Sequence, residues 1–513
     1  MLSSTWARQV TRFLSFNKNV NLIQVALKSS SSYSNLSPDM RSEVDTISKF
    51  IYDHPFPDSG FRAALAQNVN HGSLSVGVVE NVLGRLFAAH VNGLKAYEFF
   101  KFSLQVKNLN PSSDSFEKTL HILTRMRYFD QAWDLMEEIG RLDPSLLTLK
   151  SMSIMLSRIA KFGTYEEALG AFERMERDVF IGRKFGINEF NVLLRAFCTQ
   201  RQMKEARSIF HKMYQRFTPN IKTMNILLLG FKESGNVETV ELFYHEMVKR
   251  GFKPNTVTYN IRIDGYCKKR CFGDGLKLLQ QMENATCSPT LETITTLIHG
   301  AGLVRNIARA WELFNELPSR NLVPDIGVYN ALMSSLVKCK DIQSAMLLMD
   351  EMEEKHIGPD RVTYHTLFYG LMRSRGIEGV TELYHRMICK KFVLSTRTVV
   401  MLMKLFCYNG NVDMGLNLWN YIVGKGFCPH EHALALLVTC LCSHGRVKEA
   451  FACSKQMLCG GRHLSDPVFR LLERSLRRVG EEEKLASLDG MIKRLGSIYP
   501  VPRAHAVGLD ISA

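Results

Sequence analysis

The chain has 513 residues, 46% of them hydrophobic, and its 65 Lys and Arg against 50 Asp and Glu leave a formal net charge of +15. A compact chain of this length would split into about three or four domains, whereas a stack of repeats escapes that limit because each repeat contacts its neighbours. The longest apolar run, Ala433 to Cys442, is shorter than the roughly 18 residues that span a bilayer, so we expect no membrane span. A basic surface favours nucleic acid or an anionic membrane as partner.

The N-terminal segment, residues 1–35, predicts an organellar transit peptide. It carries Arg8, Arg12 and two lysines, is rich in Ser and has no acidic residue before Asp39. That composition is typical of transit peptides. The spaced arginines among apolar residues favour the mitochondrion, with the chloroplast as the alternative destination and a disordered basic tail as the alternative structure.

Residues 36–112 read as an N-terminal helical region with a degenerate capping repeat, because a hairpin fits between Leu83 and Phe102. Residues 113–500 then predict an array of about 10–11 repeats. The tail, residues 501–513, is expected to be disordered. No linker rich in Gly, Ser and Pro divides the array, so we expect one continuous superhelix.

The pattern is clearest between residues 187 and 360. Four copies of 35 residues are Ile221–Asn255, Thr256–Thr290, Leu291–Asp325 and Ile326–Asp360. In each copy apolar residues recur at helical spacing, a turn follows near a glycine such as Gly265, and a second apolar series ends at a Pro. Each copy therefore predicts a helical hairpin, and because one hairpin cannot bury its apolar face alone, neighbours must stack.

Two positions in the second helix of the hairpin recur along the chain. The first is small: Ala168, Ala206, Gly275, Ala310, Ala345, Gly415 and Ala450. The second, seven residues after that position, is Met175, Met213, Met247, Met282, Met352, Met387 and Met457. A small residue at the same place indicates that the two helices cross closely there, where a larger side chain would overpack the contact.

Motifs for metal binding and catalysis are missing from the sequence. Cys198, Cys267, Cys407 and Cys442 share one place on the inner face of the first helix, which favours packing groups over ligands. There is no Cys-x-x-Cys, Gly-rich phosphate loop, His-Glu-x-x-His or Gly-x-Ser-x-Gly, and His430-Glu431-His432 is too closely spaced for a helical zinc pair. We therefore expect reduced thiols, no metal, no cofactor and no enzymatic activity.

The repeat resembles the pentatricopeptide repeat, in the plain class of plant organellar proteins. The resemblance rests on the openings Val257-Thr-Tyr-Asn260, Val328-Tyr-Asn330 and Val362-Thr-Tyr364 and on the closings Lys253-Pro-Asn255, Val323-Pro-Asp325 and Gly358-Pro-Asp360. The competing tetratricopeptide repeat has a 34-residue period and a Trp-x-x-Leu-Gly-x-x-Tyr pattern that this chain lacks. The resemblance implies an all-α fold, a right-handed superhelical α-solenoid of helix-turn-helix repeats.

The resemblance also implies that each repeat binds one base of single-stranded RNA through its fifth and its last residue. The pairs in this chain are Asn191 with Asn220, Asn225 with Asn255, Asn260 with Thr290, Thr295 with Asp325, and Asn330 with Asp360. By resemblance they imply, from 5′ to 3′, three pyrimidines, guanine and uracil. The later pairs depart from the family pattern: His365 with Ser395, Val400 with His430, and Ala435 with Ser465.

Plainer interpretations stay open for these residues. Asn and Asp at helix starts are ordinary caps. Val257 and Val362 would pack either on base faces or within the helix start. A recurring basic position would either neutralise phosphates or be a solvated face, at Lys161, Lys268, Lys338 and Arg373.

The expected function is sequence-specific binding of organellar RNA by a monomer that acts through occupancy, in stabilisation, processing, splicing or translation. Other RNA-processing proteins are further candidate partners. A protein-protein scaffold of the helical-repeat type is the main alternative. An editing-type specificity factor is disfavoured by the nearly uniform period.

Overall fold

The computed structural model of the chain describes residues 38–54, 60–70, 74–88, 91–106, 109–374, 376–425, 427, 429–459, 462 and 464–498. Throughout these residues the secondary structure is helical and contains no strand. The predicted transit peptide and the predicted disordered tail lie outside the described residues. The chain divides into two compact units, one of residues 1–128, 421–431 and 445–513 and the other of residues 129–420 and 432–444.

The first unit combines helices from the N-terminal and the C-terminal parts of the described chain. Its helices are α3 (Pro38–Asp53), α4 (Phe61–Asn68), α5 (Val76–Ala88), α6 (Gly93–Leu104), α7 (Ser113–Arg125), α26 (Val447–Cys459), α27 (Asp466–Val479) and α28 (Glu482–Ile498). Lys95 of α6 is fully buried, and its Nζ donates to the carbonyls of Ile51 at 2.9 Å, Tyr52 at 3.1 Å and His54 at 2.7 Å. A buried ammonium group thus binds backbone carbonyls at and just after the C-terminal end of α3.

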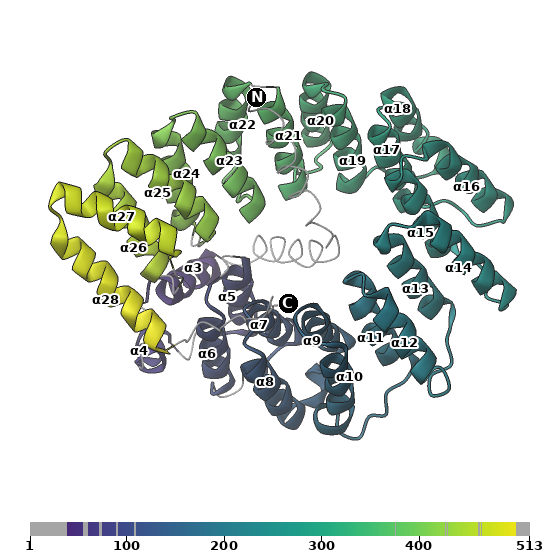
Figure 1. Cartoon of the computed structure of the whole chain (residues 1–513), viewed down its shortest axis with the longest axis horizontal. Coiled ribbons are helices and arrows are strands. Elements are labelled where there is room, and N and C mark those ends of the chain that lie inside the picture. The colour runs from purple at the N-terminus through teal and green to yellow at the C-terminus, as the bar shows by residue number, and fades with distance from the viewer. Residues whose placement is uncertain are drawn as a thin grey trace, which may run out of the picture. The chain divides into compact units, whose positions relative to one another are not determined.

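The second unit holds the regular repeats (Figure 1). Its helices are α8 (Phe129–Leu142), α9 (Leu149–Phe162), α10 (Tyr165–Arg174), α11 (Ile187–Thr199), α12 (Met203–Met213), α13 (Ile221–Ser234), α14 (Val237–Lys249), α15 (Thr256–Lys268), α16 (Phe272–Asn284), α17 (Leu291–Leu303), α18 (Ile307–Asn315), α19 (Ile326–Lys338), α20 (Ile342–Glu354), α21 (Arg361–Arg373), α22 (Ile377–Cys389), α23 (Thr396–Tyr408), α24 (Val412–Gly424) and α25 (Glu431–Ser443).

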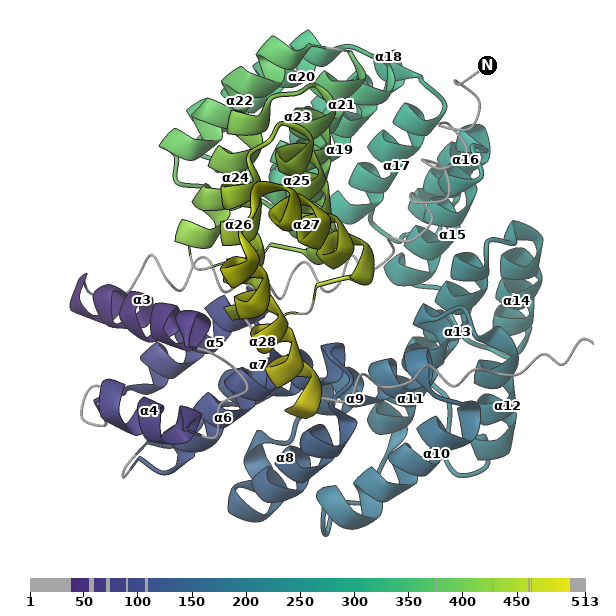
Figure 2. The same ribbon diagram turned by 60° about the vertical axis from the view of Figure 1, so that its left-hand side comes forward.

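Each repeat in this unit is a pair of helices that packs on the next pair. The first helix contacts its own second helix, as α15 contacts α16, and also the first helix of the next repeat, as α15 contacts α17 (Figure 2). The prediction of stacked helical hairpins is confirmed. Between α9 and α11, α10 continues into a π-helical turn, Met175–Val179.

The two recurrent packing positions behave as predicted. The alanines of the small-residue position are all 0% exposed, and the methionines seven residues later are at most 6% exposed. At Gly275 an added Cβ would lie 3.3 Å from the Sγ of Cys267, so the second helix approaches the first closely there. Burial raises the pKa of Cys198 and of Cys267 to about 12, which fits inert packing thiols.

The predicted turn at Gly265 is wrong, because Gly265 lies inside α15 and the chain turns after Lys268. Glycines at the equivalent position of other repeats show the role of this position in packing. A Cβ on Gly300 would come within 2.4 Å of the Sγ of Cys267, and one on Gly370 within 3.0 Å of Val337. These glycines let successive first helices approach each other; they do not reverse the chain.

Candidate functional site

The five candidate positions at the fifth residue of the repeat lie in the first turns of α11, α13, α15, α17 and α19. Their asparagines are almost fully buried, with exposed fractions of 2% for Asn191, 6% for Asn225, 8% for Asn260 and 9% for Asn330. Thr295 is partly exposed. The five side chains therefore lie at the same place on the first helices of five successive repeats in one unit.

The last residue of each repeat is the N-cap of the next first helix. Four of these side chains accept a hydrogen bond from the backbone N–H three residues further on: Asn220 from Thr223 at 2.9 Å, Asn255 from Thr258 at 3.1 Å, Asp325 from Val328 at 3.0 Å and Asp360 from Thr363 at 2.9 Å. The capping interpretation is thus correct for these four residues. The cap leaves the second polar atom of each side chain without a hydrogen bond among the described residues, so it does not exclude a ligand contact there.

Two of the predicted pairs are joined directly. The Nδ2 of Asn225 donates to the Oδ1 of Asn255 at 3.0 Å, and the Nδ2 of Asn330 donates to the Oδ1 of Asp360 at 3.1 Å. Residues 30 apart in sequence meet because the first turn of one helix lies beside the N-cap of the next first helix. In these two pairs the contact places the polar side chains of the fifth and the last residue side by side.

The other three pairs make no direct hydrogen bond within the part of the chain that the structure describes. Thr295 donates its hydroxyl instead to the carbonyl of Leu291, in its own helix, at 2.6 Å. The amide of Asn191 is buried, and neither its nitrogen nor its oxygen has a hydrogen-bond partner among the described residues. The fifth and last residues are therefore assembled as a pair in some repeats and not in others.

Comparison with known proteins assigns the family. Models of the PPR repeat family match residues 219–268, 254–302 and 324–373, a pentatricopeptide repeat domain matches residues 171–234, and a PPR repeat matches residues 150–179 and 362–392. A pentatricopeptide repeat-containing protein of Arabidopsis thaliana is 56% identical over 483 residues, which cover 94% of this chain and 97% of that relative. This chain is a member of the pentatricopeptide repeat family.

More distant relatives cover parts of the chain. One pentatricopeptide repeat-containing protein of Arabidopsis thaliana, named mitochondrial, is 27% identical over 228 residues, or 44% of this chain and 42% of the relative. Among solved structures, the pentatricopeptide repeat protein PPR10 in complex with an 18-nt psaJ RNA element aligns with a TM-score of 0.31 at 18% identity, covering 95% of this chain and 78% of that one.

Two valines stand beside the pairs of this pentatricopeptide repeat protein. Val257 is 51% exposed and Val362 is 36% exposed, although both precede fully buried residues, Thr258 and Thr363. Neither valine is a core residue. They leave apolar surface at the start of α15 and α21, next to the asparagine-containing pairs.

The recurring basic residues of the pentatricopeptide repeats have unlike surroundings. Lys268 and Lys232 both form ion pairs with Asp264. Burial acts to raise the pKa of Asp264, but the two ammonium groups outweigh it and hold that pKa below its usual value. Lys268 is therefore already neutralised within the protein, which favours a structural role for it.

Lys338 is different, because no carboxylate within the described residues forms an ion pair with it. Its Nζ lies 3.1 Å from the Nε2 of His299. Burial lowers the pKa of Lys338 to about 8, and burial together with Lys338 lowers the pKa of His299 to about 4. At neutral pH His299 is thus uncharged and Lys338 carries an uncompensated positive charge.

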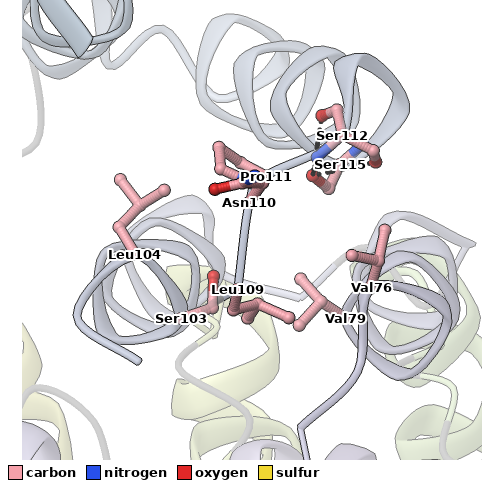
Figure 3. Close-up of a pocket in the computed structure, with 9 residues that line it drawn as sticks. All are labelled: Val76, Val79, Ser103, Leu104, Leu109, Asn110, Pro111, Ser112 and Ser115. Carbon is pink, nitrogen blue, oxygen red and sulfur yellow. Dashed lines mark hydrogen bonds between the residues drawn. The ribbon is translucent and has the colours of Figure 1, made fainter. Parts of the chain in front are cut away.

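The residues that the structure places contain no group of three or more His, Cys, Asp or Glu side chains fit to hold a metal ion. A small pocket in the first unit is lined by Val, Leu, Ser, Asn and Pro side chains and by no titratable group (Figure 3). Of the helices described, none is both long and apolar enough to cross a membrane.

Proposed function

We propose that this pentatricopeptide repeat protein binds single-stranded RNA sequence-specifically and that its fifth and last residues read one base per repeat. The observation that carries the proposal is the pairing of Asn225 with Asn255 and of Asn330 with Asp360. Each pair places two polar side chains side by side on neighbouring helices, and the exposed Val257 and Val362 add apolar surface nearby. Unstacked bases are recognised in this way, by hydrogen bonds to their edges and by packing on their faces.

The hydrogen bonds within the pairs support the bases that the family resemblance implies. Asn330 has one amide proton left after its bond to Asp360, and Asp360 accepts only, so the pair offers a donor beside an acceptor. That combination complements O4 and N3–H of uracil. In the other pair the Oδ1 of Asn255 is occupied, which leaves two amide donors, and these complement N3 and O2 of cytosine.

The proposed core is three pyrimidines, guanine and uracil, with Thr295 and Asp325 facing the guanine. The first pyrimidine is the weakest part of the core, because the buried amide of Asn191 has no hydrogen-bond partner among the described residues. We further propose that the protein acts by occupying its site, in organellar RNA metabolism. The relatives named mitochondrial and the acid-poor, basic sequence of residues 1–35 support the mitochondrion as the location.

Binding of the full chain to short RNA oligomers tests the proposal. We expect an oligomer carrying UCUGU to bind more tightly than one in which the guanine and the last uracil are replaced by adenine. Thr295→Asn should then shift the preference at the guanine position toward a pyrimidine and leave the other positions unchanged.

A matched control is available one residue away. Thr296 lies on the same turn of α17 and also donates its hydroxyl to a carbonyl of its own helix, that of Glu292 at 2.8 Å. Thr296→Asn should therefore leave the base preference as it is. Equal binding of both oligomers by the unmodified protein would contradict base reading, and the absence of RNA binding would favour the protein-protein scaffold.

A further inference from the structure

A buried threonine hydroxyl donates a hydrogen bond to each of three candidate asparagines. Thr258 donates to the Oδ1 of Asn225 at 2.8 Å, Thr293 to that of Asn260 at 2.7 Å, and Thr363 to that of Asn330 at 2.7 Å. Each threonine is the third residue of the following repeat, 33 residues after its asparagine, and each is 0% exposed. Three repeat boundaries, two of them successive, thus share one contact between neighbouring first helices.

The same hydroxyl is held in place by the helix cap. The backbone N–H of the N-cap residue donates to it: Asn255 to Thr258 at 3.1 Å, Thr290 to Thr293 at 3.0 Å, and Asp360 to Thr363 at 3.1 Å. Because a hydroxyl has one proton, the threonine accepts from the cap and has a single bond to give. For Thr363 the amide oxygen of Asn330, at 2.7 Å, is nearer than the Oδ1 of Asp360, at 3.0 Å.

Chemistry fixes which way round the asparagine amide lies. The carboxylate of Asp360 is an acceptor only, so Asn330 must turn its nitrogen toward Asp360 and its oxygen toward Thr363. In the other joined pair, the Oδ1 of Asn255 accepts a hydrogen bond from the backbone N–H of Thr258 and is therefore an acceptor. Asn225 must then turn its amide nitrogen, and not its oxygen, toward Asn255. The amide oxygen is therefore occupied, and one N–H proton remains for a base.

The third residue of a repeat varies with the fifth residue of the preceding repeat, which it faces. Thr295, whose hydroxyl bonds within its own helix, is followed by Val328. His365 is followed by Thr398, and its Nδ1 lies 3.0 Å from that hydroxyl. Val400 and Ala435, which cannot form such a bond, are followed by Ala433 and Val468.

One boundary departs from this arrangement. Thr223 donates to the Oδ1 of Asn220 at 3.0 Å, and the amide of Asn191 has no partner among the residues described. The presence of a threonine is therefore not sufficient; its hydroxyl must also reach the amide oxygen.

We propose that the third-place threonine of the following repeat is a positioning residue for base selection. It does not touch the base; it holds the amide of the fifth residue with the nitrogen outward, so that the asparagine acts as a donor. Without the hydroxyl the amide oxygen would be buried without a partner, which weakens the donor-outward placement of the amide even though the last residue still binds its nitrogen. This inference rests on the proposed RNA-binding function.

Thr363→Val in the full chain is the direct test, because valine keeps the branched shape and removes the hydroxyl. The variant is compared with the unmodified protein on UCUGU oligomers carrying each of the four bases at the last position. We expect selectivity for uracil there to fall by about three- to tenfold, the equivalent of one neutral hydrogen bond. Selectivity at the other positions should stay unchanged, and Thr363→Ser should restore the uracil preference.

Loss of the hydroxyl also removes a cap contact, so a lower melting temperature alone says nothing about positioning. Thr398→Val is the matched control, since Thr398 also contacts its N-cap residue, Ser395, and faces His365 outside the proposed core. It should lower stability and leave every base preference in the core unchanged. If Thr363→Val behaved like this control, the proposal would be overturned.

The reverse change gives a gain to look for. In Thr295→Asn the new amide faces Val328 and lacks a hydroxyl, so we expect Thr295→Asn with Val328→Thr to select a pyrimidine about three- to tenfold more sharply than Thr295→Asn alone. Equal selectivity of the single and the double variant would count against positioning.

A crystal structure of Thr363→Val separates this inference from RNA binding. Loss of the contact between the Nδ2 of Asn330 and Asp360 supports the inference, and an unchanged amide overturns it, even if no RNA binds.

Discussion

At the residue scale, one side chain serves both the helix and the proposed base contact. The Oδ1 of Asp360 accepts the backbone N–H of Val362 at 2.8 Å and of Thr363 at 2.9 Å, as well as the amide of Asn330. No described residue donates to its Oδ2. The cap thus uses one carboxylate oxygen and leaves the second open to a ligand, so capping would not compete with the proposed base reading.

Asp360→Asn separates the two roles. Asn caps a helix about as well as Asp, so the free energy of unfolding should change by no more than about 0.5 kcal/mol. The vacant acceptor becomes an amide donor, and the preferred last base should therefore change from uracil to cytosine. Thermal unfolding and titration with oligomers ending in U or C measure both effects; an unchanged base preference would show that Asp360 serves only as a cap.

At the element scale, many of the hairpins have left-handed residues in their turns. Within the described residues, the turn inside the repeat has positive φ at Arg201, Gly235, Arg270, Arg305, Lys340, Gly410 and Gly445. The turn between repeats has positive φ at Gly251, Thr286, Asn321, His356 and Lys391. Because non-glycine residues pay a steric cost there, several repeats carry local strain that a glycine would relieve.

Thr286→Gly should therefore stabilise the protein. Thr286 has a φ of 55°, which is unfavourable for a β-branched side chain, and relief of that strain should raise the free energy of unfolding by about 1 kcal/mol. Gly251 has a φ of 85° at the equivalent place, and Gly251→Thr is the mirrored control, expected to destabilise. Urea unfolding compares the variants; a destabilised Thr286→Gly would mean that the turn does not strain the chain.

The sequence predicted the elements well and their polar contacts less well. Burial repeats with the period, so the packing positions at Ala310 and Met282 could be read directly from spacing. Gly265 in the sequence favours a turn, because a glycine taken alone does not distinguish chain reversal from a close approach of two helices. The bond from Thr363 to Asn330 joins residues 33 apart, and spacing alone does not say which hydroxyl reaches which amide.

At the scale of the whole molecule, charge and sequence reading should contribute separately. The net charge of +15 attracts any RNA, and residues such as Lys338, which carries no ion-pair partner among the described residues, would contact phosphates. The proposed base contacts would be hydrogen bonds to mostly buried side chains and would release few ions. Affinity should thus have a general part that depends on salt and a selective part that does not.

Titration over a range of salt concentrations tests this separation. For single strands, log K should fall linearly with log salt, with a slope of about −0.7 for each phosphate neutralised. The UCUGU oligomer and its adenine-substituted form present the same phosphates, so their slopes should be equal and the ratio of their affinities constant. Lys338→Met should reduce both slopes by up to about 0.7 without changing that ratio. A ratio that falls toward one as salt rises would mean that phosphate contacts, and not the asparagine-containing pairs, produce the preference.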